Sequence, residues 1–236
     1  IGLAAGPLIA EPILVKHGFV AFFMTTAGLA AAAFLLHLPV PDQHRLLATR
    51  GAASPSFFAL LRTRKMLVSG GIALLFGVGL AATGNFIAPF AQEKQLSYIS
   101  VYFLAYAGAA VGTRICLARL ADRFGEQQII PWGLWIAALG LLIVPLVQTN
   151  AMLLGVGFIF GVGHGLIFPS LNAMAIRGEP YAARGKVTGI FTGGIDSGAF
   201  TGALILGLIG DLGGYTTLFV AAAVIVSTGH LLLRRH

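Results

Sequence analysis

The sequence predicts an all-α protein that crosses a membrane about eight times, and three observations support this fold class. Of the 236 residues, 57% are hydrophobic and only 10% are charged, with a mean hydropathy of +0.90. Apolar runs of about 20 residues recur along the chain, long enough for a helix to cross a hydrocarbon core of roughly 30 Å. The sequence lacks the alternating segments of about ten residues that are typical of a transmembrane barrel.

Polar or glycine-containing turns separate the apolar runs. The prolines of 39–41 end the second run, because proline interrupts a helix. The long polar stretch is 43–65, in which Ser54-Pro55 is expected to begin a short surface helix near 57–61. In chain order, we expect spans at 2–15, 19–38, 66–91, 96–117, 129–147, 151–176, 187–209 and 215–233.

The cations predict the orientation of the chain. All of the 15 lysines and arginines except Lys16 and Lys94 lie in alternate loops or at the C-terminus. Cytoplasmic loops of membrane proteins carry such an excess, so we expect these loops and the C-terminus to face the cytoplasm. The predicted location is a cell membrane, either a plasma membrane or a bacterial inner membrane. The cytoplasmic loops then account for the net charge of +7, so binding to nucleic acid is not expected. The expected partner is the lipid bilayer.

A charged loop at 118–128 interrupts the apolar runs. It resembles the cytoplasmic loop signature of the major facilitator superfamily, in the weaker form that lies between helices 8 and 9 of that family. Ala118 stands where the family has glycine, and Glu126-Gln127 stands where it has two basic residues. The residues that agree with the signature are Leu120, Ala121, Asp122, Arg123 and Gly125.

A second motif lies at the start of the chain. Gly2, Gly6 and Pro7 resemble the glycine-proline motif on helix 5 of the antiporter branch of the same family, although Ala10-Glu11 stands where two glycines are usual. Together the resemblances imply a partial major facilitator-type helical bundle covering helices 5 to 12. We therefore expect further N-terminal helices of the same protein to precede Ile1.

The resemblance implies three regions. Residues 1–38 would be the last two helices of the N-terminal bundle, with the first one truncated. Residues 39–65 would be the central cytoplasmic linker, and residues 66–236 the C-terminal six-helix bundle. In this arrangement Asp122 would cap the span that begins near 185–187, because the first N–H groups of a helix are unsatisfied and partly positive. The alternative is that Asp122 is an ordinary solvated loop charge.

Polar residues inside the spans are the candidate transport residues, since ionisable groups at this depth usually face a cavity or a partner. Asp196 lies about ten residues into its predicted span, and Thr192 and Thr188 precede it on nearly the same helix face. We hypothesise that Asp196 couples protons or recognises a cation, with the threonines forming a polar track from the cytoplasm. The alternative is a structural aspartate bonded to neighbouring hydroxyl or backbone groups.

The remaining candidates could line a substrate path or could pack in the protein interior. His164 lies in the middle of the 151–176 span, and it would titrate together with Asp196 if the two faced each other. Asn85 follows a glycine at which a helix break would expose polar backbone. The other candidates for a substrate or proton path are Asn172, Tyr102 and Tyr106.

Two glycine series are spaced by four residues, one at Gly157, Gly161 and Gly165 and one at 194, 198 and 202. Such series allow close approach of membrane helices. They do not follow strands, so a dinucleotide-binding site is excluded. We expect no catalytic residues, no cofactor and no metal site, because the sequence shows no nucleophile–base set and no cluster of metal ligands.

The expected function is secondary active transport of a small molecule by alternating access, in the form of proton-coupled efflux. The expected partners are a small-molecule substrate and protons. An uptake symporter or a facilitator of the same fold is the first alternative, and the motif at Gly2–Pro7 argues against it. A membrane-embedded enzyme or receptor is the alternative from another class.

Overall fold

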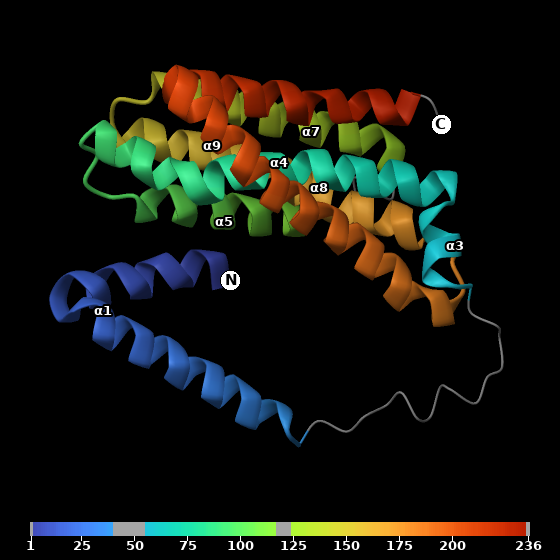
Figure 1. The fold of residues 1–236 in the computed structure, drawn as a ribbon, viewed down its shortest axis with the longest axis horizontal. Helices are drawn as coiled ribbons and strands as arrows, with labels where there is room; N and C mark the ends of the chain where they lie inside the picture. Colours follow the sequence, from blue (N-terminus) through green and yellow to red (C-terminus); the bar gives the residue numbers. More distant parts are fainter. Residues whose placement is uncertain (1, 40–54, 117–123, 235–236) are drawn as a thin grey trace. The chain divides into compact units, whose positions relative to one another are not determined.

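A computed structural model describes residues 2–39, 55–116 and 124–234, and Figure 1 shows that this part of the chain is helical. Its elements are helices and the turns between them, with no strand among the described residues. The chain divides into two units, 1–54 and 55–236, each of which is described by itself. The boundary lies inside the segment that the sequence predicts to be a linker.

The first unit contains one helical element, α1 (Gly2–His37). Its helix is broken at Gly18, whose φ of 75° lies in the left-handed region that glycine adopts at little cost. The two parts of α1 correspond to the first two predicted spans. The stretch from Pro12 to His37 is long and apolar enough to cross a membrane.

The second unit contains the other helices. A break occurs at Gly214 in the last of them, where φ is 74°, so that element supplies the two final predicted spans. In chain order the elements are α3 (Phe57–Leu61), α4 (Arg64–Glu93), α5 (Ser100–Cys116), α7 (Glu126–Ile143), the short 3-10 helix η1 (Val144–Leu146), α8 (Asn150–Ile176) and α9 (Tyr181–Arg234).

Length and composition make several of these helices membrane-spanning. Besides the stretch in α1, four stretches of the described second unit are long and apolar enough to cross a membrane. They are Arg64–Glu93, Glu126–Leu146, Asn150–Ile176 and Tyr181–Leu233. With 17 residues, α5 is shorter than the predicted span at 96–117, and Tyr98 precedes the helix.

Side-chain caps fix where three helices begin. Ser56 accepts a hydrogen bond from the backbone N–H of Ala59 at the start of α3, which has the bounds that the sequence predicts. Thr63 caps α4 and Thr149 caps α8 in the same way. One predicted start is wrong, because α9 begins at Tyr181 rather than near 187.

Two helix pairs of the second unit contain the predicted glycine series, α4 with α9 and α5 with α8, and α7 packs against both α8 and α9. In Figure 1 the first half of α9 crosses α4 obliquely. Both predicted glycine series lie at these contacts. A side chain at Gly161 of α8 would run into the backbone carbonyl of Tyr106 on α5, and one at Gly198 of α9 would run into the carbonyl of Leu74 on α4.

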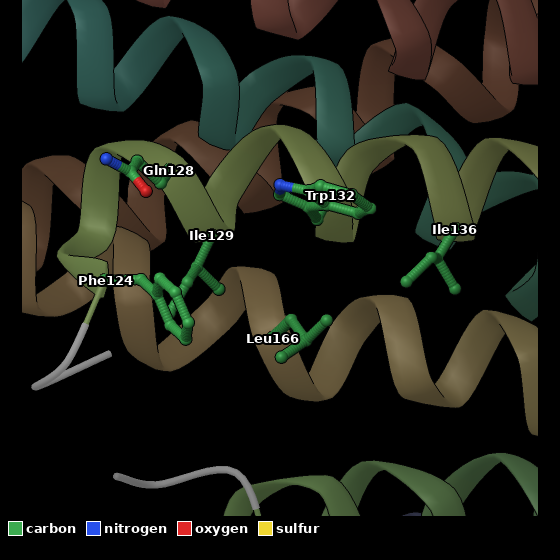
Figure 2. A pocket seen from close by; sticks show the side chains of 6 residues that line it. All are labelled: Phe124, Gln128, Ile129, Trp132, Ile136 and Leu166. Carbon is green, nitrogen blue, oxygen red and sulfur yellow. The ribbon is translucent and has the colours of Figure 1, made fainter. Parts of the chain in front are cut away.

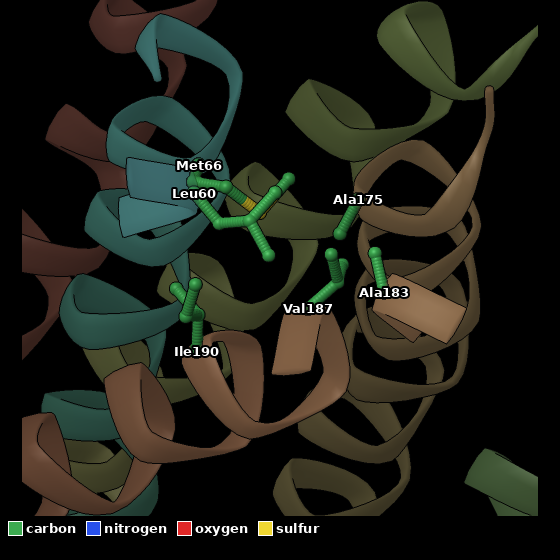
Figure 3. Packing of buried hydrophobic residues seen from close by; sticks show 6 residues of the cluster. All are labelled: Leu60, Met66, Ala175, Ala183, Val187 and Ile190. Atoms are coloured by element: carbon green, nitrogen blue, oxygen red, sulfur yellow. The ribbon is translucent and has the colours of Figure 1, made fainter. Parts of the chain in front are cut away.

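An apolar cluster closes one end of the bundle, where α3 and the start of α4 meet the end of α8 and the start of α9 (Figure 3). Burial of these side chains connects the short helix α3 to the second unit. The buried members are Leu60, Met66, Ala175, Ala183, Val187 and Ile190. Leu60 and Met66 are thereby placed against α9, although α9 begins more than 100 residues later in the chain.

Candidate transport site

A buried polar pair connects α5 and α8. The Tyr106 hydroxyl and Nδ1 of His164 share a hydrogen bond, and both side chains are buried. His164 lies midway along α8, as the sequence predicts, but its ring faces the partner helix α5. Because buried polar groups are costly unless they are hydrogen-bonded, the pair stabilises this helix contact.

Aromatic rings surround the histidine. The ring of Phe76 on α4 meets His164 edge-on with centroids 5.2 Å apart, and the ring of Phe168 lies 5.7 Å from it. The guanidinium of Arg114 lies over the Phe168 ring at 5.2 Å, which is a cation–π arrangement. His164, Phe168 and Asn172 are spaced by four residues, so the three side chains follow one face of α8.

Two further candidates lie near this pair or on the same face of α8. The ring of Tyr102 stacks on Tyr106, and its buried hydroxyl interacts with the side chain of Thr83 on α4. The buried Oδ1 of Asn172 has no hydrogen-bond partner within the described part of the chain, so this position favours a water molecule or a polar ligand group. The sequence selected both residues as candidates for a substrate or proton path.

The aspartate predicted for proton coupling lies on another surface. Asp196 is exposed, whereas the preceding residue Ile195 is buried. Five residues at 3.6 per turn place Asp196 about 140° around α9 from Phe191, which packs on α8 through Phe168. No hydrogen bond or ion pair joins the Asp196 carboxylate to another described residue.

The structure therefore does not bring Asp196 and His164 together. His164 faces α5 and α4, while Asp196 is turned away from the contacts that α9 makes with its neighbours. The polar track of Thr188 and Thr192 stays a prediction, and the Thr192 hydroxyl donates to the backbone carbonyl of Thr188 at 2.9 Å. Both threonines are half-buried, and the Thr192 hydroxyl is satisfied within its own helix.

No helix break occurs at Asn85. The helix α4 is continuous through this position, and the exposed Asn85 side chain donates from Nδ2 to the carbonyl of Ala81 at 3.1 Å. The polar backbone that a break would expose is therefore hydrogen-bonded within the helix. Asn85 contributes an exposed polar side chain near the far end of α4.

Ion pairs that the sequence analysis did not identify connect the helix ends at one end of the bundle. We call this end, defined by Lys65, Glu126, Arg177 and Glu179, the charged end. Nη2 of Arg177 donates to the carboxylate of Glu126 at 2.5 Å, which joins the end of α8 to the start of α7. Nζ of Lys65 donates to Glu179 at 2.9 Å and to the Arg177 carbonyl at 2.5 Å.

The sequence contains one indication of these ion pairs, because Glu126 stands where the family signature has a basic residue. Its carboxylate lies in the first turn of α7, where the partial positive charge of the helix terminus favours an anion. The sequence pattern identifies Arg177 and Lys65 only as loop cations. Their partners depend on how the helix ends meet in space, which the sequence does not reveal.

Most of the predicted gate loop lies outside the described residues, namely Leu120, Ala121, Asp122 and Arg123. Gly125 is described, and its φ of 79° is in the left-handed region expected of a glycine in a tight turn. The expected contact of Asp122 near 185–187 stays a prediction, because Asp122 lies outside the described residues. The helix α9 begins at Tyr181, so the backbone at 185–187 lies inside the helix and its first turn is 181–184.

The motif of Gly2, Gly6 and Pro7 lies in the first part of α1, before the break at Gly18. Its backbone is helical, as the predicted span requires. Gly6 is exposed, with no other atom near the position that a side chain would occupy.

Comparison with known proteins places this arrangement in context. The family model described as Major Facilitator Superfamily matches residues 1–177 and 105–235. An uncharacterized MFS-type transporter of Salmonella typhimurium, STM4428, is 30% identical over 169 residues, which are 69% of this chain and 43% of that protein. The uncharacterized MFS-type transporter YhhS of Escherichia coli strain K12 is 27% identical over 219 residues, or 92% of this chain and 52% of that protein.

A further YhhS protein, from Salmonella paratyphi C, is 28% identical over 215 residues, which are 90% of this chain and 51% of that protein. The chain thus spans about half the length of the curated relatives that it resembles.

Proposed function

Because this chain belongs to the major facilitator superfamily, we propose that the complete protein is a secondary active transporter of small molecules. The proposed mechanism is alternating access, in which two helical bundles rock about a site between them. The proposed coupling ion is the proton, and the proposed direction is efflux. Family membership and the apolar helices support transport across a membrane, and Asp196 in the middle of the first half of α9 supports the coupling.

The position of Asp196 is the observation that carries this proposal. The residue lies 15 positions after Tyr181, or about 22 Å along the helix, and a similar length separates it from the break at Gly214. A carboxylate at this depth is strongly disfavoured against lipid. Since Asp196 is exposed and unpaired within the described chain, its face of α9 is suited to a water-filled cavity or to the other bundle.

We assign the two units different parts in this mechanism. The second unit would supply the C-terminal six-helix bundle, and α1 would supply the last two helices of the N-terminal bundle. The N-terminal helices of the same protein would complete the cavity that Asp196 faces. Substrate and protons would then bind between the bundles, where both sides of the membrane can reach them alternately.

We also propose an orientation, with the charged end and the C-terminus in the cytoplasm. The loop cations support it, because all lysines and arginines except Lys16 and Lys94 belong to this side. The proposed gate contact of Asp122 is with the start of α9, where the partial positive charge of the helix terminus favours a carboxylate. This contact would hold the cytoplasmic side closed.

The motif at Gly2–Pro7 is the reason for proposing efflux, since it resembles the helix 5 motif of the antiporter branch. An uptake symporter would use the same carboxylate with the opposite net direction. Counter-flow measurements on the complete protein in proteoliposomes distinguish the two. Efflux predicts that an outwardly directed substrate flux draws protons in the opposite direction.

Replacement of the carboxylate tests the coupling. The complete protein is reconstituted in proteoliposomes that enclose a pH-sensitive dye, and amphipathic cations such as ethidium and tetraphenylphosphonium are added as probes. We expect the wild type to move protons when a transported cation is present. Asp196→Asn should lower this proton flux at least about tenfold, because the amide cannot exchange a proton.

Ser197→Ala provides the matched control, since Ser197 is the exposed neighbour of Asp196 on α9. This variant should keep the wild-type proton flux. Proton-driven transport that is equal in Asp196→Asn and wild type would refute the proposed coupling role.

A further inference from the structure

Two adjoining hollows lie on the side of the bundle formed by α7 and α8. The first is an apolar groove with a volume of about 460 Å³. Figure 2 shows Ile129 and Ile136 pointing from α7 toward α8, and Leu166 pointing from α8 toward α7. The residues that line this apolar groove are Phe124, Gln128, Ile129, Trp132, Ile136 and Leu166.

The second hollow is a polar pocket, also of about 460 Å³, at the charged end. It includes Lys65, Glu126 and Arg177, together with the side chains of Gln127 and Met174. Phe124 and Gln128 line both hollows, so the polar pocket continues into the apolar groove. A charged pocket at a helix end that opens into an apolar groove along the same helices has the amphipathic form of a lipid molecule.

The donors in the polar pocket are suited to a phosphate group. Arg177 uses one Nη atom for Glu126, yet its side chain is 73% exposed, so that other N–H groups of the planar guanidinium remain accessible. Guanidinium groups bind phosphate oxygens through two parallel hydrogen bonds. The cations Lys65 and Arg177 are paired with Glu179 and Glu126, so the phosphodiester would be held by the remaining guanidinium N–H groups and not by a net positive charge.

The groove is suited to a hydrocarbon chain. Its side chains are apolar except for Gln128, and Trp132 is 70% exposed. Tryptophan is enriched where the hydrocarbon meets the headgroups, and Trp132 lies less than two helical turns from the start of α7. Since α7 and α8 are both long and apolar enough to cross a membrane, the exposed mouth of this groove lies at the depth of lipid chains.

We propose that these hollows together form a binding site for one glycerophospholipid of the leaflet at the charged end. The phosphodiester occupies the polar pocket against Arg177, and one acyl chain lies in the groove between Ile129, Ile136 and Leu166. The site depends on the membrane placement of α7 and α8 alone. It holds whichever direction of transport or coupling ion the complete protein uses.

Native mass spectrometry of the complete protein, delipidated in detergent and titrated with phosphatidylglycerol, tests the site. We expect one phospholipid to bind more tightly than the rest. Ile136→Trp fills the groove and should weaken this binding at least about tenfold. Leu139→Trp is the matched control, because it adds the same ring at an exposed position of α7 outside the groove, and it should bind as the wild type does.

The headgroup contact is tested with a double variant, Glu126→Gln with Arg177→Gln, which removes the guanidinium without leaving Glu126 as a buried unpaired charge. Its binding of phosphatidylglycerol should weaken at least about tenfold. Dioleoylglycerol, which lacks the phosphate, should bind the wild type equally weakly, phosphatidylethanolamine should bind, and inorganic phosphate should not displace the lipid.

Three results would overturn the proposal. Unchanged lipid binding in Ile136→Trp would show that the groove is not occupied. An equal loss in Leu139→Trp would show non-specific lipid around the protein. Equal affinity for dioleoylglycerol and phosphatidylglycerol would show that the polar pocket does not recognise the phosphodiester.

Discussion

The two helix pairs of the second unit are packed alike but direct their polar groups differently. In both pairs a glycine series allows the helix backbones to approach closely, α8 on α5 at Gly161 and α9 on α4 at Gly198. On α8, the ionisable side chain of His164 faces inward and hydrogen-bonds to Tyr106 on the partner helix. On α9, the side chain of Asp196 faces outward and has no such partner among the described residues.

The two residues therefore differ in what their own bundle provides. The His164 ring is hydrogen-bonded within its own bundle, which stabilises the packing of α5 on α8. The aspartate brings a charge to the middle of a membrane helix and gains nothing from its own bundle. This contrast is the reason for proposing Asp196, rather than His164, as the residue that couples protons.

Replacing one glycine of each helix pair with alanine tests whether the two pairs depend on close backbone packing in the same way. Gly198→Ala and Gly161→Ala place Cβ against the carbonyls of Leu74 and Tyr106, where the backbone cannot move aside cheaply. We expect each change to lower the stability by about 3 kcal/mol or more, seen as a large fall in the Tm of the complete protein in detergent.

The controls lie on the same helices. Gly193→Ala on α9 and Gly155→Ala on α8 add the methyl group where no other atom lies within 4 Å. They should leave the Tm unchanged or raise it slightly, because alanine favours the helix. A fall of equal size in the controls would show that helix propensity, rather than close packing, governs these positions.

The inward pair is tested with a double-mutant cycle. His164→Phe and Tyr106→Phe each leave one buried polar group without its partner, which should cost about 1–3 kcal/mol. The double variant should lose less stability than the sum of the two, because it removes both partners. The measurement is the change in Tm of the complete protein for the two single variants and the double variant.

Proton flux in the same variants sharpens the comparison. Any variant of the pair that still folds should keep coupled transport, in contrast to Asp196→Asn. Additive losses of stability would contradict the hydrogen bond, and a loss of coupling with intact stability would assign His164 to the transport chemistry instead.

The sequence predicted the features that depend on local pattern. Apolar runs predicted the helices, the Ser54-Pro55 turn predicted α3, and spacing by four predicted the glycine contacts. One boundary was wrong for a local reason. The start of α9 was assigned where hydropathy rises, but Ala182, Ala183 and Arg184 are good helix formers that extend the helix beyond its apolar part.

Side-chain direction could not be predicted in the same way. The helices α8 and α9 are apolar on nearly all sides, so no amphipathic pattern tells which face turns to the bundle. The sequence therefore allowed His164 and Asp196 to face each other. In the structure the two side chains do not face each other. Gly161 must face α5 and Gly198 must face α4, and these contacts fix the rotation of each helix. The ion pair of Glu126 with Arg177 escaped for a similar reason, since it joins residues 51 positions apart.

We expect the smallest effect from a substitution of Thr192. This substitution tests whether proton coupling on the outward face of α9 depends on Asp196 alone. Its hydroxyl already donates to the Thr188 carbonyl, so the hydroxyl proton is engaged within the helix. Thr192→Val keeps the branched shape and should change the stability by less than about 0.5 kcal/mol. Proton flux in proteoliposomes should equal that of the wild type, with Asp196→Asn measured beside it as the inactive reference. A reduced proton flux in Thr192→Val with an unchanged Tm would support the polar track that the sequence predicted, and Asp196 would then no longer act alone on this face.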